Sequence, residues 1–164
     1  MCPYTRHAAV AVLVRNRPLA NSVLVGIEKT MKKQSKPTVL VVDDDPECLA
    51  SARNALQNDY HVFQATDADE ALRLLEKHIP SVIILDVMMP GKKDGFATFC
   101  DLKQDPRTSS IPVIMLTQVN ELTKLEFSER EMERYLGESP AAFLEKPISD
   151  ARLRAAVEQV LGAS

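Results

Sequence analysis

The stretch VLVVDDDP, at residues 39–46, decides the fold of this chain. Its apolar run ends on three consecutive aspartates, Asp43, Asp44 and Asp45, and Pro46 then begins a segment whose apolar residues recur at helical spacing. A short apolar run rich in valine predicts a strand buried on both faces, which is typical of parallel sheets. The stretch therefore predicts the first strand and helix of an α/β domain, with aspartates at the carboxyl end of the strand.

Three later stretches repeat the pattern of an apolar run that ends on a polar residue: VIILDVMMPG at 82–91, VIMLT at 113–117 and FLEKP at 143–147. Their polar residues are Asp86, Thr117 and Lys146. The carboxyl ends of neighbouring parallel strands line one crevice. We therefore expect this carboxylate, hydroxyl and ammonium to share one pocket with the aspartates that follow the first strand.

Strand and helix patterns alternate about five times from Thr38 onward, which indicates a doubly wound α/β domain with crossover helices. Strands are expected near 38–42, 61–65, 81–86, 111–117 and 141–145. Helices are expected near 45–57, after Asp67, near 95–104 and 120–136, and from about 149 onward. Asp45 and Asp67 are predicted N-caps, and Glu70 resembles the second half of a capping box.

The overall composition excludes several classes of protein. The chain has 164 residues, of which 45% are hydrophobic and 26% charged. It contains no run of 18 apolar residues, which is about the length needed to span a bilayer. Three cysteines without a CxxC pair indicate neither a disulfide framework nor a zinc site, so we expect a cytoplasmic protein. Beyond residue 36, 22 acids outnumber 13 bases, which argues against a nucleic-acid partner.

Residues 1–36 differ from the rest, because they carry seven Lys or Arg and one acid. The apolar run AAVAVLV at 8–14 is too short to span a membrane, and the segment fits neither a secretory signal nor a transit peptide well. Met31, followed by the polar lead KKQSKP, suggests an alternative start. We interpret 1–36 as an N-terminal extension, flexible or upstream of the native start, and 37–164 as the functional domain.

The expected pocket suits metal-assisted phosphoryl chemistry. Carboxylates of Asp43, Asp44 and Asp86 repel one another unless a cation neutralises them, and Mg²⁺ prefers such oxygen ligands. Thr117 and Lys146 supply a hydroxyl and a positive charge, which suit a phosphoryl anion. No organic cofactor is expected, and an aspartate can itself be the phosphoryl acceptor.

The motifs VLVVDDDPE, VIILDVMMPGKKDG, LKQDPRTSSIPVIMLT and FLEKPI resemble the receiver domain of two-component response regulators, as in chemotaxis receivers. The resemblance covers residues 38–161 and implies a flavodoxin-like parallel sheet of five strands in the order 2-1-3-4-5, with helices on both faces. It implies that Asp86 is the phosphoacceptor and that Asp43, Asp44, Asp86 and the backbone carbonyl of Met88 hold Mg²⁺.

The same resemblance assigns Thr117 as the switch hydroxyl, Lys146 as the family's lysine and Phe143 as the switch aromatic, with a cis bond between Lys146 and Pro147. It implies a sensor histidine kinase or histidine phosphotransfer protein as phosphoryl donor. Because the sequence ends at Ser164, we expect a stand-alone receiver that signals to another protein by contact. We expect self-catalysed phosphotransfer and slow autodephosphorylation, and no enzymatic turnover.

Some residues depart from the family pattern, and two alternatives stay open. Gln118 replaces a small residue, and the segment between Thr117 and Lys146 is longer than usual, so a degenerate receiver that binds partners without phosphorylation is one alternative. The other is a small haloacid-dehalogenase-like phosphatase with Asp43 as nucleophile. Met88 and Val119 are apolar where polar groups often align water, which predicts slow loss of the phosphoryl group.

Overall fold

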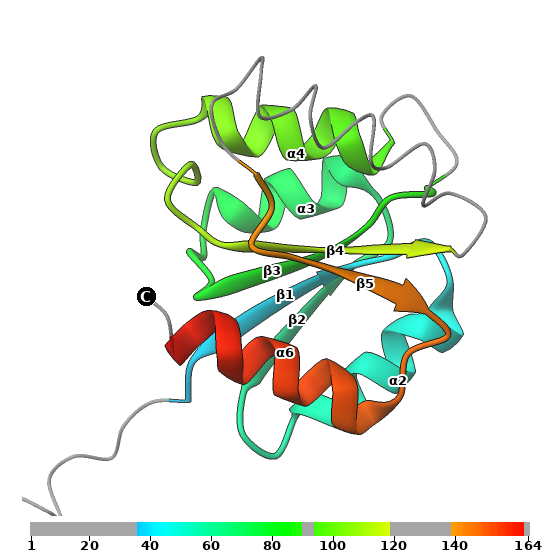
Figure 1. The fold of residues 1–164 in the computed structure, drawn as a ribbon. Coiled ribbons are helices and arrows are strands. Elements are labelled where there is room, and N and C mark those ends of the chain that lie inside the picture. Colours follow the sequence, from blue (N-terminus) through cyan, green and yellow to red (C-terminus); the bar gives the residue numbers. More distant parts are fainter. Residues whose placement is uncertain (1–35, 90–93, 119–138, 163–164) are drawn as a thin grey trace, which may run out of the picture. The chain divides into compact units, whose positions relative to one another are not determined.

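A computed structural model of the chain describes residues 36–89, 94–118 and 139–162. Its five strands form one parallel sheet in the order β2-β1-β3-β4-β5 (Figure 1). The strands are β1 (Thr38–Val42), β2 (His61–Ala65), β3 (Val82–Asp86), β4 (Val113–Gln118) and β5 (Ala142–Lys146). The predicted flavodoxin-like strand order is confirmed.

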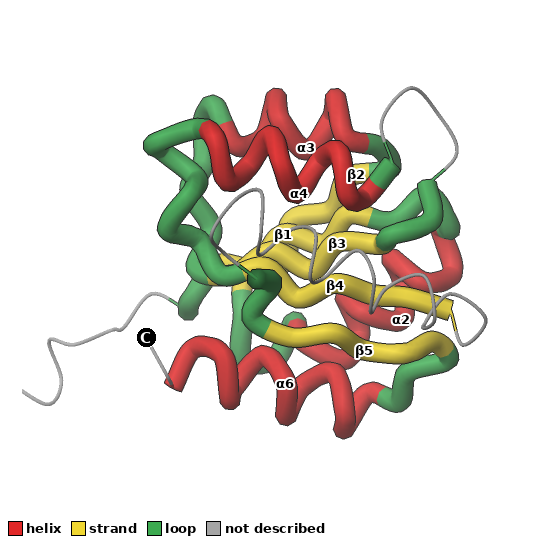
Figure 2. Tube along the Cα trace, turned by 45° about the horizontal axis from the view of Figure 1, so that its top comes forward, coloured by secondary structure: helices red, strands yellow, loops and turns green. Residues whose placement is uncertain are grey.

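Helices cover both faces of the sheet. Those described are α2 (Pro46–Leu56), α3 (Ala68–Leu75), α4 (Gly95–Gln104) and α6 (Asp150–Gly162). Helices α3 and α4 lie together on one face, and α2 and α6 lie on the other (Figure 2). Alternate residues of each central strand face the two helical layers, so the apolar runs 39–42 of β1, 82–85 of β3 and 113–116 of β4 carry the core.

Three of the described helices have an aspartate as N-cap, the residue just before the helix, which is a favoured residue at that position. Asp45 Oδ1 accepts a hydrogen bond from the Glu47 N–H at 2.8 Å, and Asp67 Oδ1 accepts one from the Glu70 N–H at 2.7 Å. The predicted capping box is only half formed. Glu70 Oε2 accepts from the N–H and hydroxyl of Thr66, at 2.8 and 2.9 Å, one residue before the expected partner.

The strand boundaries differ slightly from those expected. Strand β4 begins at Val113, two residues late, because Pro112 lacks an N–H and contributes only its carbonyl, which accepts from the Ile83 N–H at 3.0 Å. Strand β5 ends at Lys146, so this lysine belongs to the strand. The helix expected at 120–136 and residues 1–35 lie outside the described residues. Among those described, no helix is long and apolar enough to cross a membrane.

Candidate functional site

Two adjacent strands bring the predicted aspartates together. In the parallel pairing of β1 with β3, Val42 lies beside Leu85, so the next residues, Asp43 and Asp86, lie at the same level. Both are buried, with exposed fractions of 0% and 3%, and Asp44 is exposed. One carboxylate oxygen from each of the three aspartates lies within 4.8 Å of the others. The sequence prediction that these acids form one cluster is confirmed.

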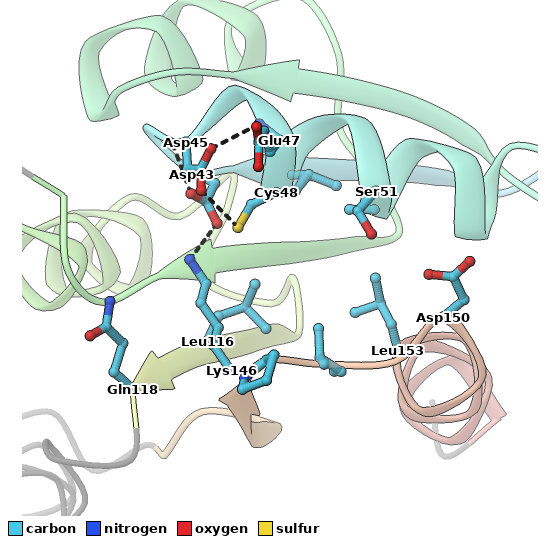
Figure 3. Close-up of a pocket in the computed structure, with 14 residues that line it drawn as sticks. Asp43, Asp45, Glu47, Cys48, Ser51, Leu116, Gln118, Lys146, Asp150 and Leu153 are labelled. Carbon is cyan, nitrogen blue, oxygen red and sulfur yellow. Dashed lines mark hydrogen bonds and ion pairs between the residues drawn. The ribbon is translucent and has the colours of Figure 1, made fainter.

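Lys146 reaches this cluster from β5, two strands away from β3. Its Nζ lies 2.7 Å from Asp43 Oδ2 and 3.2 Å from Asp86 Oδ2 (Figure 3 shows the contact with Asp43). The lysine side chain is 16% exposed, so both contacts are largely shielded from water. A single ammonium therefore bridges two buried carboxylates. The peptide bond between Lys146 and Pro147 is cis, as the family resemblance implied.

Burial and neighbouring charges set the protonation of this group. Burial raises the pKa of Asp86, as does the charge of Asp43, and the ammonium of Lys146 opposes them in part. For Lys146, burial lowers the pKa, but the hydrogen bond to Asp43 and the charge of Asp86 outweigh it, so the net pKa is raised. The lysine is therefore a cation at neutral pH.

The two carboxylate oxygens of Asp86 have different surroundings. Oδ2 faces the Lys146 ammonium, whereas Oδ1 is buried and, among the described residues, has no hydrogen-bond partner. A buried oxygen without a donor is costly, by about 1 to 3 kcal/mol, more when it is charged. Together the carboxylates of Asp43, Asp44 and Asp86 offer oxygen ligands that fit a hard divalent cation such as Mg²⁺.

Thr117 lies on β4, beside the strand that carries Asp86, and Phe143 lies on β5. The Thr117 side chain is buried, and its hydroxyl makes a long hydrogen bond of 3.3 Å to the carbonyl of the next residue, Gln118. Phe143 is half-buried in β5 and packs against the core beneath α3 and α4. Gln118 is exposed and pairs in register with Lys146 across β4 and β5.

Two further residues frame the acceptor aspartate. Met88, two residues after Asp86, exposes 48% of its surface, so the side chain at this position is apolar and accessible to water. Gly95 donates its N–H to the Val87 carbonyl at 3.0 Å and packs against the backbone of Asp86. Gly95 was not predicted as a site residue, although its place directly after the N-cap Asp94 was a usable signal.

Known proteins share this sheet and these motifs. A family model described as the response regulator receiver domain matches residues 39–158. The response regulator PleD of Caulobacter vibrioides is 35% identical over 123 residues, which are 74% of this chain and 25% of that protein. The probable transcriptional regulator ycf27 of Guillardia theta is 35% identical over 133 residues, 78% of this chain and 46% of its own length.

Solved structures agree with the sequence matches. The receiver domain of NtrX from Brucella abortus superposes with a TM-score of 0.67 at 26% identity and covers 77% of this chain and 99% of its own. Chemotaxis response regulator CheY4 of Vibrio cholerae gives 0.65 at 26% identity, over 76% and 98%. The chain spans less than half the length of the first curated relatives. It belongs to the family of response regulator receiver domains, the signalling modules of two-component systems.

Proposed function

We propose that this domain accepts a phosphoryl group on Asp86. One observation carries the proposal: Asp86 has one carboxylate oxygen held by Lys146 and the other, Oδ1, buried without a donor among the described residues. A carboxylate oxygen without a hydrogen-bond partner keeps its lone pairs available for attack as a nucleophile. Its neighbours, Asp43 and Asp44, supply the negative charge that a divalent cation needs.

The proposed reaction transfers phosphorus from nitrogen to oxygen. Asp86 Oδ1 attacks the phosphorus atom of a phosphohistidine, the phosphorus–nitrogen bond breaks, and its electron pair returns to the imidazole nitrogen. The product is an acyl phosphate on Asp86. This displacement needs no general base, because a carboxylate is already ionised and positioning supplies most of the rate. Lys146 contributes by holding the second carboxylate oxygen and then contacting a phosphoryl oxygen.

The metal ligands are proposed as Asp43, Asp44, Asp86 and the backbone carbonyl of Met88. When bound, Mg²⁺ supplies positive charge to the acceptor carboxylate and to the oxygens of the incoming group. The protein holds Asp43 ready for this role, because Asp43 Oδ1 accepts the Asp45 N–H at 3.0 Å and Oδ2 contacts Lys146. The three carboxylates thus converge without rearrangement of the strands.

Thr117 and Phe143 are proposed as the switch. A phosphoryl group adds nearly two negative charges beside Lys146. The Thr117 hydroxyl, whose present bond to the Gln118 carbonyl is long at 3.3 Å, can turn to donate to a phosphoryl oxygen. The half-buried ring of Phe143 can then fill the space on that side of β4. Such a change biases a two-state surface for contact with a downstream protein.

The donor is proposed to be a sensor histidine kinase or a histidine phosphotransfer protein. Relatives of this chain include proteins named histidine kinase P4, from Formosa agariphila, and sensor histidine kinase TmoS, from Ectopseudomonas mendocina, which supports this class of partner. We place the domain in the cytoplasm, because both described cysteines, Cys48 and Cys100, are free thiols. Self-catalysed transfer and slow loss of the phosphoryl group are its only proposed chemistry.

Acetyl phosphate with Mg²⁺, followed by intact mass measurement, tests the acceptor. We expect one added phosphoryl group on the chain without substitutions and none on Asp86→Asn. Asparagine has the same shape as aspartate but lacks the carboxylate. The matched variant Asp45→Asn, which alters an exposed cap, should still be modified. Modification retained in Asp86→Asn but lost in Asp43→Asn would instead indicate Asp43 as the nucleophile, and no modification at all would indicate a degenerate receiver.

A further inference from the structure

A cavity of about 610 Å³ lies beside the acidic cluster, between the first half of α2, the ends of β4 and β5, and the start of α6 (Figure 3). Its volume falls in the range of about 300 to 1,000 Å³ that is usual for small-molecule sites. Buried side chains of Val41, Leu116 and Leu153 form apolar parts of its wall. The cavity therefore offers an apolar surface large enough to cover a small organic molecule.

Negative charge dominates the lining of this cavity. Four carboxylates line it, those of Asp43, Asp45, Glu47 and Asp150, against one ammonium, that of Lys146. The ammonium is already engaged by Asp43 and by Asp86, so it does not neutralise the others. In the part of the chain that the structure describes, the side chains of Glu47 and Asp150 have no hydrogen-bond or ion-pair partner.

The charged and apolar groups are separated along the cavity. Figure 3 shows Asp45 and Glu47 at one end, Asp150 toward the other end, and Ser51 between them. Burial, together with the charge of Asp43, raises the pKa of Cys48 to about 11, so this residue lines the wall as a neutral thiol. Asp43 and Lys146 also line the cavity but form an ion pair with each other, so the acids at the two ends are the carboxylates left for a ligand. This arrangement matches a molecule that is apolar in its middle and positively charged at its ends.

We propose that this cavity binds a small organic cation with an apolar body, most simply an aliphatic diamine. The hydrocarbon chain covers Leu116 and Leu153, and the ammonium groups pair with Glu47 and Asp150 at the two ends. The residues that would contact the diamine all line the cavity, and Asp86 does not line it. The cavity excludes the acceptor carboxylate itself but adjoins the phosphoryl site and shares Asp43 and Lys146 with it.

Calorimetric titration of the full chain, without divalent cations, tests the chemical class of the ligand. The probes are three molecules with the same eight-carbon chain: octanediamine, octanediol and octanedioate. We expect saturable binding of the diamine, at least about tenfold tighter than that of the diol, and no binding of the dicarboxylate. Equal binding of the diamine and diol, preferential binding of the dicarboxylate, or no saturable binding of the diamine would each overturn the proposal.

Variants on exposed positions locate the binding. Ser51→Phe fills the cavity from α2, whereas Ala50→Phe places the same ring on the preceding residue, which lines a different pocket. Diamine affinity should fall at least tenfold in the first and stay unchanged in the second. Removing the charge of Glu47 with Glu47→Gln should weaken binding several-fold, and Glu158→Gln, on the exposed part of α6 outside the cavity, should not. Equal effects within either pair would contradict this location.

The variant Asp86→Asn separates this inference from the proposed function. It should lose phosphoryl acceptance and still bind the diamine saturably, although more weakly than the unsubstituted chain, because Asp86 no longer offsets the charge of Lys146 in the lining of the cavity. If acetyl phosphate modifies the protein but the diamine does not bind, only the cavity proposal fails. If the diamine binds but Asp86 is never modified, the cavity proposal stands and the proposed function fails.

Discussion

Gly95, the first residue of α4, lies directly against the backbone of Asp86. A Cβ atom at position 95 would stand 2.1 Å from the Asp86 carbonyl oxygen and 2.7 Å from Val87 Cα. Both neighbours are main-chain atoms of the acceptor strand and its loop, so neither can rotate out of the way. The start of α4 therefore packs directly on the main chain of Asp86 and Val87, and only glycine permits this approach.

The substitution Gly95→Ala should destabilise the domain by about 2 kcal/mol, because the added methyl group forces the acceptor loop and α4 apart. Phosphoryl acceptance should slow as well, since the Asp86 carboxylate moves with its backbone. Chemical denaturation and acetyl phosphate labelling measure the two effects. Gly162→Ala is the matched control, because nothing lies within 4 Å of its added Cβ. If the two variants were equally stable, the main chain around Asp86 would accommodate the added methyl group at no cost, which would contradict this prediction.

Lys146 and Asp43 should be energetically coupled. Their side chains are 16% and 1% exposed and 2.7 Å apart, so loss of either leaves a shielded charge without its partner. We expect a coupling free energy of about 2 kcal/mol in a double-mutant cycle of Asp43→Asn and Lys146→Met, measured by denaturation in EDTA. Single-variant effects that simply add would mean that the contact contributes nothing to stability.

Stability without divalent cations should fall as pH rises, through the titration of Asp86. Burial raises the pKa of Asp86, so the folded state binds this proton more tightly than the unfolded chain does. The free energy of unfolding then decreases with pH between the ordinary value of 3.8 and the raised folded pKa, and is independent of this group below 3.8.

Asp86→Asn cannot ionise, so its stability should change less over that pH window. Denaturant titrations of both proteins across the acidic range, in EDTA, give the comparison. Above the window, Asp86→Asn should be the more stable protein. Parallel pH profiles would contradict the raised pKa.

The phosphoryl group should be lost slowly. Met88, two residues after Asp86, is apolar and exposed, so its side chain offers no polar group to orient an attacking water. Met88→Gln supplies such a group and should accelerate decay about tenfold, whereas Met88→Leu should leave it unchanged. Decay is followed by intact mass after removal of acetyl phosphate. Loss of the phosphoryl group within seconds from the phosphorylated chain without substitutions would contradict this expectation.

The sequence was sufficient for the sheet and for the acidic cluster. Short apolar runs fixed β1 and β3 as buried parallel strands, and each run ended on its aspartate. Parallel pairing then required Asp43 and Asp86 to lie side by side, and they do. The helix starts followed for the same reason, because Asp45 and Asp67 carry local capping chemistry that depends on few distant contacts.

Details that depend on tertiary approach were not predictable. The sequence could place Lys146 at a strand end, but not show that one ammonium would bridge Asp43 and Asp86 across the end of β4. The role of Gly95 depends on how closely α4 approaches the β3 backbone, which no local pattern encodes. The cavity beside α2 likewise arises from the spacing of α2 and α6 around the strand ends.

Reductive trapping of the modified residue is the most direct test of the central claim. Borohydride reduces an aspartyl phosphate to homoserine, which peptide mass spectrometry locates in the chain. After treatment with acetyl phosphate and Mg²⁺, we predict homoserine at position 86 and nowhere else. Homoserine at position 43 or 44, or a phosphorylated protein that yields no homoserine at position 86, would contradict the assignment of Asp86 as the phosphoryl acceptor.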